Sequence, residues 1–325
     1  MIGVPTKTRW HVTTYGLQLP DFSWLAAEPA ETLPRIRSVA EAAEAAGFSS
    51  LWVMDHFHQL PPLGGETGAM FEAYTLLGAL AAVTERIRLG ALVTGVTYRN
   101  PAMLAKQVTG LDVLSGGRAI CGIGAAWYQE EHAAFGWDFP PLRERYERLD
   151  EAVQVLRLLF REEVSTFDGT HYRLAGARNV PAPIQAGGPE LMIGGSGEQK
   201  TLRLVARLAN SCNVSGSVED VTRRMGLLDD YCGEVGREPS SLRRTRLGSM
   251  FLAGSDAEAQ GTRDFLAGVG ADTSTMVIGT HEQVVDQVRA YIAAGLDDVL
   301  FNLPQITTVD AVHAAGAALE EACAG

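Results

Sequence analysis

Cysteine is scarce in this chain, which has only Cys121, Cys212, Cys232 and Cys323 among its 325 residues. Their spacing matches neither a disulfide framework nor a zinc-binding motif. Cys121 and Cys212 fall in apolar runs, where a free thiol behaves as a small hydrophobic side chain. This pattern indicates reduced core thiols in a cytoplasmic protein.

The chain also lacks long apolar runs and an excess of basic residues. No apolar run reaches the about 18 residues that a membrane-spanning helix needs, and residues 1–10 contain no signal-peptide core. Lys and Arg number 27 against 39 Asp and Glu, so the formal net charge is −12. An acidic chain repels nucleic acid and anionic membranes. We therefore expect a soluble protein whose partner is a small-molecule substrate.

The sequence does contain a regular alternation of helical and strand-like segments. With 46% hydrophobic and 20% charged residues, it has enough apolar side chains for a large core. Eight segments are expected to be strands, each followed by a helical segment: residues 8–17, 51–54, 87–96, 118–124, 191–194, 209–214, 245–253 and 298–303. Eight such units favour a closed (β/α)8 TIM barrel over an open, doubly wound sheet.

Two long loops and one longer excursion interrupt this alternation. Residues 59–69 and 125–141 both follow strands, so we predict insertion segments at the C-terminal face of the barrel. Residues 163–189 contain a hairpin-like Phe167-Asp168-Gly169 turn and several Pro and Gly residues. We assign the whole chain, residues 1–325, to a single barrel domain with this inserted excursion.

Three polar side chains follow the apolar run 51–54, namely Asp55, His56 and His58. The C-terminal ends of barrel strands carry the chemistry of this fold. His56 is a candidate general acid or base because imidazole titrates near neutrality, although a hydrogen-bonded core histidine has the same signature. His56 and His58 also have the spacing of a zinc site, which makes a barrel hydrolase a rival hypothesis. The other histidines fall where they cannot complete the metal shell, so we expect no metal.

A glycine-rich turn, Gly194-Gly195-Ser196-Gly197, lies between a predicted strand and a predicted helix. Glycines let the backbone approach a ligand closely, and a helix N-terminus presents free N–H groups to an anion. We predict that Gly194, Gly195 and Ser196 bind the phosphate of a cofactor. A tight strand-to-helix turn is the structural alternative.

Several motifs, taken in chain order, resemble the bacterial luciferase-like superfamily of flavin and deazaflavin oxidoreductases. They are Ser-Leu-Trp-Val-Met-Asp-His-Phe at 50–57, the segment 87–131 with its Leu-Asp-Val-Leu-Ser-Gly-Gly-Arg run, Ile-Gly-Gly-Ser-Gly at 193–197 and Val-Leu-Phe-Asn-Leu-Pro at 299–304. The branch that the chain most resembles uses the deazaflavin coenzyme F420. The resemblance also implies an eight-stranded α/β barrel with insertion segments.

For the site, the resemblance implies that Asp55 contacts the deazaflavin ring and that His56 faces its reactive carbon. It implies a non-proline cis peptide between Leu92 and Val93 against one face of the ring, and a hydrogen bond from Thr94 to the cofactor. The implied reaction is hydride transfer between F420 and a substrate, in either direction. A monooxygenase with FMN is the alternative, and a protein that holds its cofactor without turnover is a third. A homodimer is expected from the same resemblance.

The substrate side differs from that of the sugar-phosphate dehydrogenases that resemble this chain. They carry an acidic residue where Trp127 stands, which argues against a sugar phosphate and favours an apolar or aromatic substrate. Glu130 is a polar candidate in the same loop. The side chains predicted to line the substrate side are Phe22, Trp24, Phe57, Phe71 and Trp127.

Overall fold

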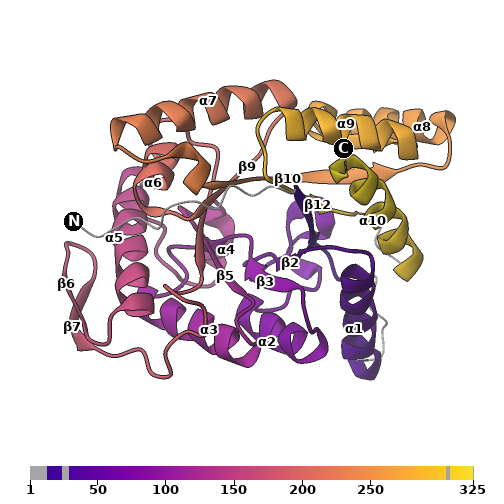
Figure 1. Ribbon diagram of the computed structural model, residues 1–325. Coiled ribbons are helices and arrows are strands. Elements are labelled where there is room, and N and C mark those ends of the chain that lie inside the picture. The colour runs from indigo at the N-terminus through magenta and orange to yellow at the C-terminus, as the bar shows by residue number, and fades with distance from the viewer. Residues whose placement is uncertain (1–12, 24–28, 305–307, 325) are drawn as a thin grey trace.

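A computed structural model describes residues 13–23, 29–304 and 308–324 of the chain. At its centre, eight parallel strands form a closed ring (Figure 1). In their order around the ring they are β1 (Thr14–Leu19), β2 (Ser50–Val53), β3 (Arg88–Ala91), β5 (Ala119–Gly124), β8 (Glu190–Gly194), β9 (Ser211–Val214), β10 (Arg243–Leu252) and β12 (Asp298–Asn302). The predicted (β/α)8 barrel is therefore confirmed.

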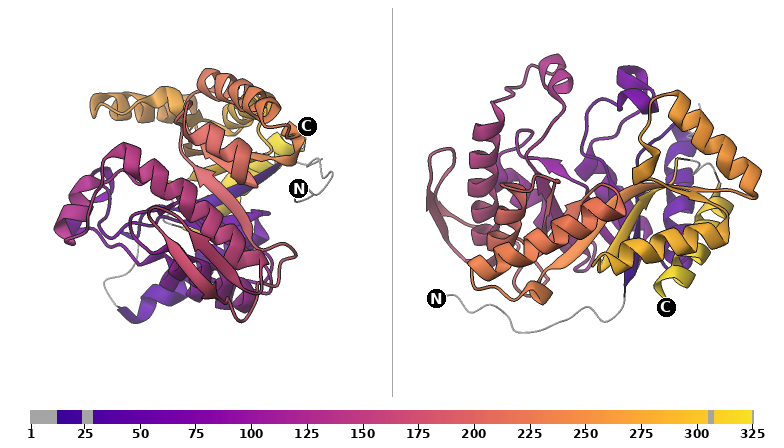
Figure 2. Two further views of the ribbon diagram at one scale, coloured as in Figure 1. Left: turned by 90° about the vertical axis from the view of Figure 1, so that its left-hand side faces the viewer. Right: turned by 90° about the horizontal axis from the view of Figure 1, so that it is seen from above.

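Helices lie on the outside of these strands, as Figures 1 and 2 show. They are α1 (Pro29–Ala45), α2 (Ala73–Val83), α3 (Pro101–Leu114), α5 (Leu142–Arg161), α6 (Thr201–Leu208), α7 (Val218–Glu234), α8 (Asp256–Gly268), α9 (His281–Ala293) and α10 (Val309–Cys323), and a short α4 (Gln129–Ala134) lies in the loop 125–141. None of the described helices combines the length and the apolar character that crossing a membrane requires.

The excursion at 163–189 contains the predicted hairpin. Strands β6 (Ser165–Asp168) and β7 (Arg173–Ala177) pair in antiparallel fashion and lie beside α5, at the left edge of Figure 1. The carboxylate of Glu151 on α5 accepts hydrogen bonds from the backbone amides of Thr170, His171 and Tyr172. This side chain fixes the hairpin turn against the barrel.

Three strand predictions differ from the structure. The segment 87–96 is not one strand, because β3 ends at Ala91 and β4 (Thr94–Gly95) follows only after a cis Leu92–Val93 peptide. The first strand begins at Thr14, and the predicted residues 8–12 lie outside the described residues. The segment between α8 and α9 lies outside the eight predicted strands, and it contains β11 (Val277–Gly279), which pairs with β10.

The barrel interior is a small apolar core of its own, made of Trp52, Leu92, Ile120, Met192 and Leu300. The indole N–H of Trp52 donates to Ser50 Oγ at 2.8 Å, so its polar atom is satisfied inside the barrel. A Cβ atom on Gly90 would lie 2.7 Å from the Trp52 ring. Glycine at this position therefore makes room for the indole, which fills the barrel below the strand ends.

The four cysteines are free, as predicted. Cys121 in β5 and Cys212 in β9 are buried, and burial raises the pKa of their thiols to about 12 and about 11. These thiols stay protonated at neutral pH and pack as apolar side chains.

Replacing Gly90 with alanine is expected to lower the free energy of unfolding by about 1–3 kcal/mol, because the new methyl group overpacks the barrel interior. It would also lie 3.0 Å from the Ile120 carbonyl oxygen. Gly110→Ala in α3 is the matched control, since an added Cβ there meets nothing within 4 Å and alanine favours a helix. Urea unfolding measures both variants. Equal stability of the two would contradict this packing.

Candidate functional site

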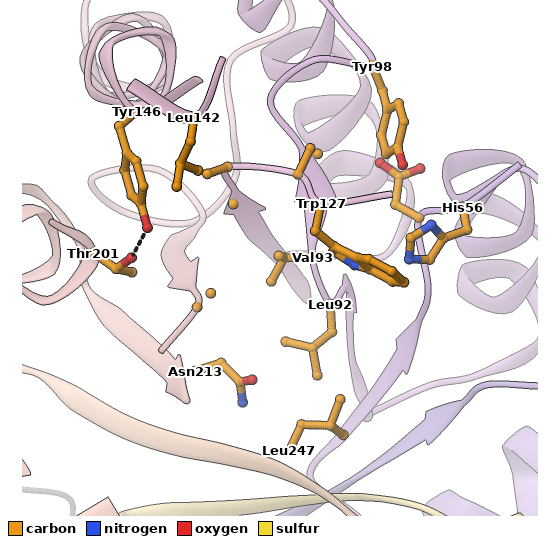
Figure 3. A pocket seen from close by; sticks show the side chains of 17 residues that line it. His56, Leu92, Val93, Tyr98, Trp127, Leu142, Tyr146, Thr201, Asn213 and Leu247 are labelled. Atoms are coloured by element: carbon orange, nitrogen blue, oxygen red, sulfur yellow. Dashed lines mark hydrogen bonds between the residues drawn. The ribbon is translucent and has the colours of Figure 1, made fainter. Parts of the chain in front are cut away.

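A cavity of about 330 Å³ opens at the C-terminal ends of the barrel strands (Figure 3). Its volume is in the range of small-molecule sites. Residues at or just beyond the ends of β2, β3, β5 and β8 contribute to its wall, as do side chains from β9, β10, α5 and α6. The residues of the wall are Asp55, His56, Leu92, Val93, Gly95, Tyr98, Gly124, Ala125, Ala126, Trp127, Leu142, Tyr146, Gly194, Gly195, Thr201, Asn213 and Leu247.

His56 stands in this wall directly after β2, and a carboxylate from another loop holds its ring. His56 Nδ1 lies 3.3 Å from Oε2 of Glu131, whose side chain is fully buried. The ring also meets the Trp127 indole edge-on, with 5.6 Å between ring centres. With Nδ1 turned toward Glu131, Nε2 is the ring nitrogen that can exchange a proton with a ligand in the cavity.

Glu131 is a residue that the sequence reasoning missed. Its carboxylate accepts hydrogen bonds from the backbone amides of Phe57 and His58 and from the Tyr98 hydroxyl. Burial alone would raise the pKa of Glu131, but the hydrogen bonds from His56 and these groups outweigh burial and lower it to about 2. Glu131 is therefore an anion at neutral pH, and an anion there places a ring proton of His56 on Nδ1.

The sequence singled out Glu130 instead, one residue earlier. Glu130 is exposed on α4, whereas Glu131 is turned inward. Both residues lie in the first turn of this short helix. The sequence Glu130-Glu131 alone does not show which carboxylate is buried. The residue at which α4 begins decides which of the two side chains points inward.

Asp55 also borders the cavity, but its carboxylate is already paired. Arg99 donates to both carboxylate oxygens, at 2.6 and 2.9 Å, and also binds Glu72 at 2.5 Å. Burial raises the pKa of Asp55, and the charge and hydrogen bonds of Arg99 counteract that effect. The guanidinium compensates a buried charge behind the cavity. Contact between Asp55 and a cofactor ring stays a prediction.

The peptide between Leu92 and Val93 is cis, as the resemblance implies, and both residues line the cavity. Val93 packs against glycines of two neighbouring strands. A Cβ on Gly124 or on Gly194 would lie 2.9 or 2.7 Å from the Val93 side chain. Leu92 and Val93 thus form an apolar wall against which a flat ring can lie.

Two residues that were predicted to bind the cofactor form hydrogen bonds with other residues of the protein. The Thr94 hydroxyl is fully buried and lies 2.8 Å from the Tyr74 hydroxyl. The Ser196 hydroxyl lies 3.0 Å from Ser215 Oγ and accepts a hydrogen bond from the Ser215 amide at 3.0 Å. Among the described residues, neither Thr94 nor Ser196 is in the cavity wall. Gly195 is, and its φ of +137° is in the region that favours glycine.

Three polar side chains that the sequence did not single out complete the wall: Tyr146 from α5, Thr201 at the start of α6, and Asn213 from β9. The Tyr146 and Thr201 hydroxyls are 2.9 Å apart, and Figure 3 shows this pair across the cavity from His56. The N-terminus of α6 lies here, and helix N-termini attract anions. The amphipathic pattern of α5 gave no signal, since it assigns Tyr146 to an ordinary packing face.

Trp127 lines the cavity while 62% of its surface is exposed. Its indole stacks on Tyr128, with 5.0 Å between ring centres. Arg145 from α5 donates hydrogen bonds to the carbonyl oxygens of Ala125 and Ala126, directly before Trp127. The loop is therefore held by α5, and it presents an exposed indole at the cavity mouth.

The other predicted aromatic residues lie elsewhere. Phe57 packs against Tyr98 and Trp137, and Phe71 packs edge-on against Phe22, with 4.9 Å between ring centres. Among the described residues, none of Phe22, Phe57 and Phe71 is in the cavity wall. Phe57 follows His56 directly, but the chain bends at Phe57 and its ring lies with Tyr98 and Trp137. Trp24 lies outside the described residues.

The zinc hypothesis finds no ligand set in the described part of the chain. There, no group of three or more His, Cys, Asp or Glu side chains is placed to hold a metal ion. The His58 ring packs against Phe135, with 4.9 Å between ring centres, and His56 is engaged with Glu131.

The folded-state pKa of Glu131, about 2, lies below the ordinary value of 4.5, so the stability it contributes is present above pH 4.5 and lost as the pH falls toward 2. We expect the stability difference between the wild type and Glu131→Gln to shrink by about 2 kcal/mol from pH 7 to about pH 3. Urea unfolding across this range measures it, with Glu130→Gln as the exposed control. A difference independent of pH would contradict a buried anionic Glu131.

Known proteins are similar in sequence to this chain over most of its length. The family model described as luciferase-like monooxygenase matches residues 13–274. An F420-dependent glucose-6-phosphate dehydrogenase of Tsukamurella paurometabola is 30% identical over 297 residues, which cover 82% of this chain and 87% of that protein. The enzyme of the same name from Amycolatopsis mediterranei is 28% identical over 295 residues, with the same coverage.

Among solved structures, the coenzyme F420 dependent tetrahydromethanopterin reductase from Methanopyrus kandleri has the same fold. Its TM-score is 0.76 at 19% identity, and the match covers 94% of this chain and 97% of that chain. The family match spans every residue of the cavity wall, from Asp55 to Leu247. This chain belongs to the luciferase-like monooxygenase family.

Proposed function

We propose that the protein is an F420-dependent oxidoreductase that transfers a hydride between the coenzyme and a small, neutral, apolar or aromatic substrate. The observation that carries this proposal is the pairing of an apolar Leu92–Val93 wall with a histidine held by buried Glu131 in one cavity. Relatives at 28–30% identity over 82% of the chain are named F420-dependent enzymes, which supports the same cofactor.

The cavity residues suit a ring cofactor with an anionic chain. Leu92 and Val93 offer a flat apolar surface to the ring. Tyr146 and Thr201 offer hydroxyls on the other side, and the start of α6 offers its amide dipole to a phosphate. When bound, the deazaflavin supplies the hydride chemistry, and the protein supplies orientation and electrostatics.

His56 is suited to move the proton that accompanies hydride transfer. Reduction of a carbonyl requires a proton at the substrate oxygen, and oxidation of an alcohol releases one there. Glu131 keeps the ring oriented through Nδ1, so Nε2 is the atom that donates or accepts this proton. The Trp127 indole lies beside the His56 ring, where it would cover a bound substrate and exclude water from it.

The cavity wall favours a neutral substrate over a phosphorylated one. Among its described residues it contains no Lys or Arg, whereas Leu92, Val93, Trp127, Leu142 and Leu247 are apolar. The start of α6 is assigned to the cofactor phosphate, and on the side of His56 and Trp127 a substrate phosphate dianion would meet no cation in the wall. We therefore infer an alcohol or carbonyl compound with an apolar or aromatic substituent, in contrast to the sugar phosphate named in the relatives.

An FMN-dependent monooxygenase is the second candidate, because the matching family model is described as luciferase-like monooxygenase and the sequence resemblance leaves FMN as the alternative cofactor. The same apolar wall accepts a flavin ring. The two candidates differ in their need for oxygen, since a deazaflavin transfers hydride and reacts poorly with oxygen.

Replacing His56 with alanine should lower turnover by about 100-fold or more, because general acid–base assistance is lost. F420 affinity should stay within about threefold, because the apolar wall and the phosphate side remain. The assay follows F420 absorbance without oxygen, with secondary alcohols and aromatic ketones tested beside sugar phosphates. His281→Ala, an exposed histidine paired with Glu321, is the control.

Unchanged turnover of His56→Ala would remove His56 from the mechanism. Activity confined to sugar phosphates would overturn the proposed substrate class and leave the cofactor assignment intact. Turnover that requires oxygen and FMN would favour the second candidate.

A further inference from the structure

A second groove, of about 340 Å³, lies next to the cavity, between α5 and α6. Four basic side chains line it: Arg143 from α5, Lys200 directly before α6, and Arg203 and Arg207 on α6. Two acidic side chains of α5, Glu147 and Asp150, also line it, and Arg143 pairs with Glu147 at 2.8 Å. The groove is thus a locally basic surface on a chain whose formal net charge is −12.

The basic residues from the α6 side form one row. Lys200, Arg203 and Arg207 are spaced three and then four residues apart, so they lie on the same side of a helix, over about 10 Å of its length. Arg203 pairs with Glu234, and Arg207 binds Asp150 at 2.9 Å. Both pairs are about half exposed, and such pairs contribute little, so a ligand anion can compete for them.

Lys200 is the most available cation of the row. Its Nζ lies 5.2 Å from the ring centre of Tyr146. Within the described residues it forms no ion pair, and its side chain is exposed. It stands where the row begins, at the edge shared with the main cavity.

Tyr146 connects the main cavity with the α5–α6 groove, because it lines both of them. Its hydroxyl lies 2.9 Å from the Thr201 hydroxyl at the start of α6 (Figure 3). The side of the cavity proposed for the phosphate therefore adjoins the basic groove. A molecule whose ring lies against Val93 and whose phosphate lies near Thr201 would continue toward Lys200.

We propose that the α5–α6 groove binds an acidic, carboxylate-bearing extension of the molecule held in the main cavity. This inference rests on the proposed function, since coenzyme F420 carries glutamate residues beyond its phosphate. The row of cations anchors that chain and raises affinity without touching the reacting atoms. A ligand that ends before the phosphate would not use it.

The test is a fluorescence titration of the full chain with two probes: F420 with its glutamate chain, and a truncated deazaflavin that keeps the phosphate and lacks the glutamates. The variant is Lys200→Glu/Arg203→Glu. Its control is Arg37→Glu/Arg289→Glu, which makes the same charge change on α1 and α9, at exposed arginines that also pair with acidic residues. Circular dichroism checks that all variants are folded.

We expect the groove variant to weaken F420 binding by about tenfold or more, while binding of the truncated deazaflavin changes less than about twofold. Wild-type affinity should fall more steeply for F420 than for the truncated deazaflavin as salt rises from about 50 to about 500 mM. Equal losses in the groove and control variants, or no loss in either, would overturn the groove proposal while leaving the proposed function standing. Binding of neither probe by the wild type would overturn both.

Discussion

The carboxylate of Glu131 is the interaction on which the candidate site depends. A buried carboxylate loses several kcal/mol of hydration, which here is offset by His56, the Tyr98 hydroxyl and two backbone amides. These bonds join the loop after β5 to the loop after β2, 75 residues apart along the chain. One side chain therefore orients His56 and brings Trp127 beside it. Loss of the carboxylate would remove these hydrogen bonds and leave the two loops joined by aromatic contacts, such as those of His56 with Trp127 and of His58 with Phe135.

The barrel beneath supplies an apolar floor. Trp52 fills its centre, and small residues such as Gly90 and Gly194 let large side chains from neighbouring strands lie between them. Above this floor, the two sides of the cavity differ in their chemistry. One side has the apolar wall and His56, and the other has two hydroxyl groups and the N-terminus of α6. The basic groove lies beyond Tyr146. This gradient from apolar to cationic matches a ligand with an uncharged ring and an anionic chain.

The barrel and the strand-end position of Asp55 and His56 could be predicted from sequence, because buried parallel strands give short apolar runs that stop at polar residues. The partners of these residues could not. Arg99 and Glu131 come from distant segments, and their inward direction depends on the exact start of α4 and on the path of the loops. Ser196 occupies the predicted turn, but its hydroxyl pairs with the next strand-to-helix loop, a contact that no local pattern records.

The most direct test of the account is a parallel titration of purified cofactor-free protein with coenzyme F420 and with FMN, followed by ligand fluorescence. We expect F420 to bind at least about tenfold more tightly than FMN, because the family relatives, the apolar wall and the basic groove all suit a deazaflavin with an acidic chain. Tight binding of FMN with weak or absent binding of F420 would contradict it and make oxygen-dependent flavin chemistry the working function.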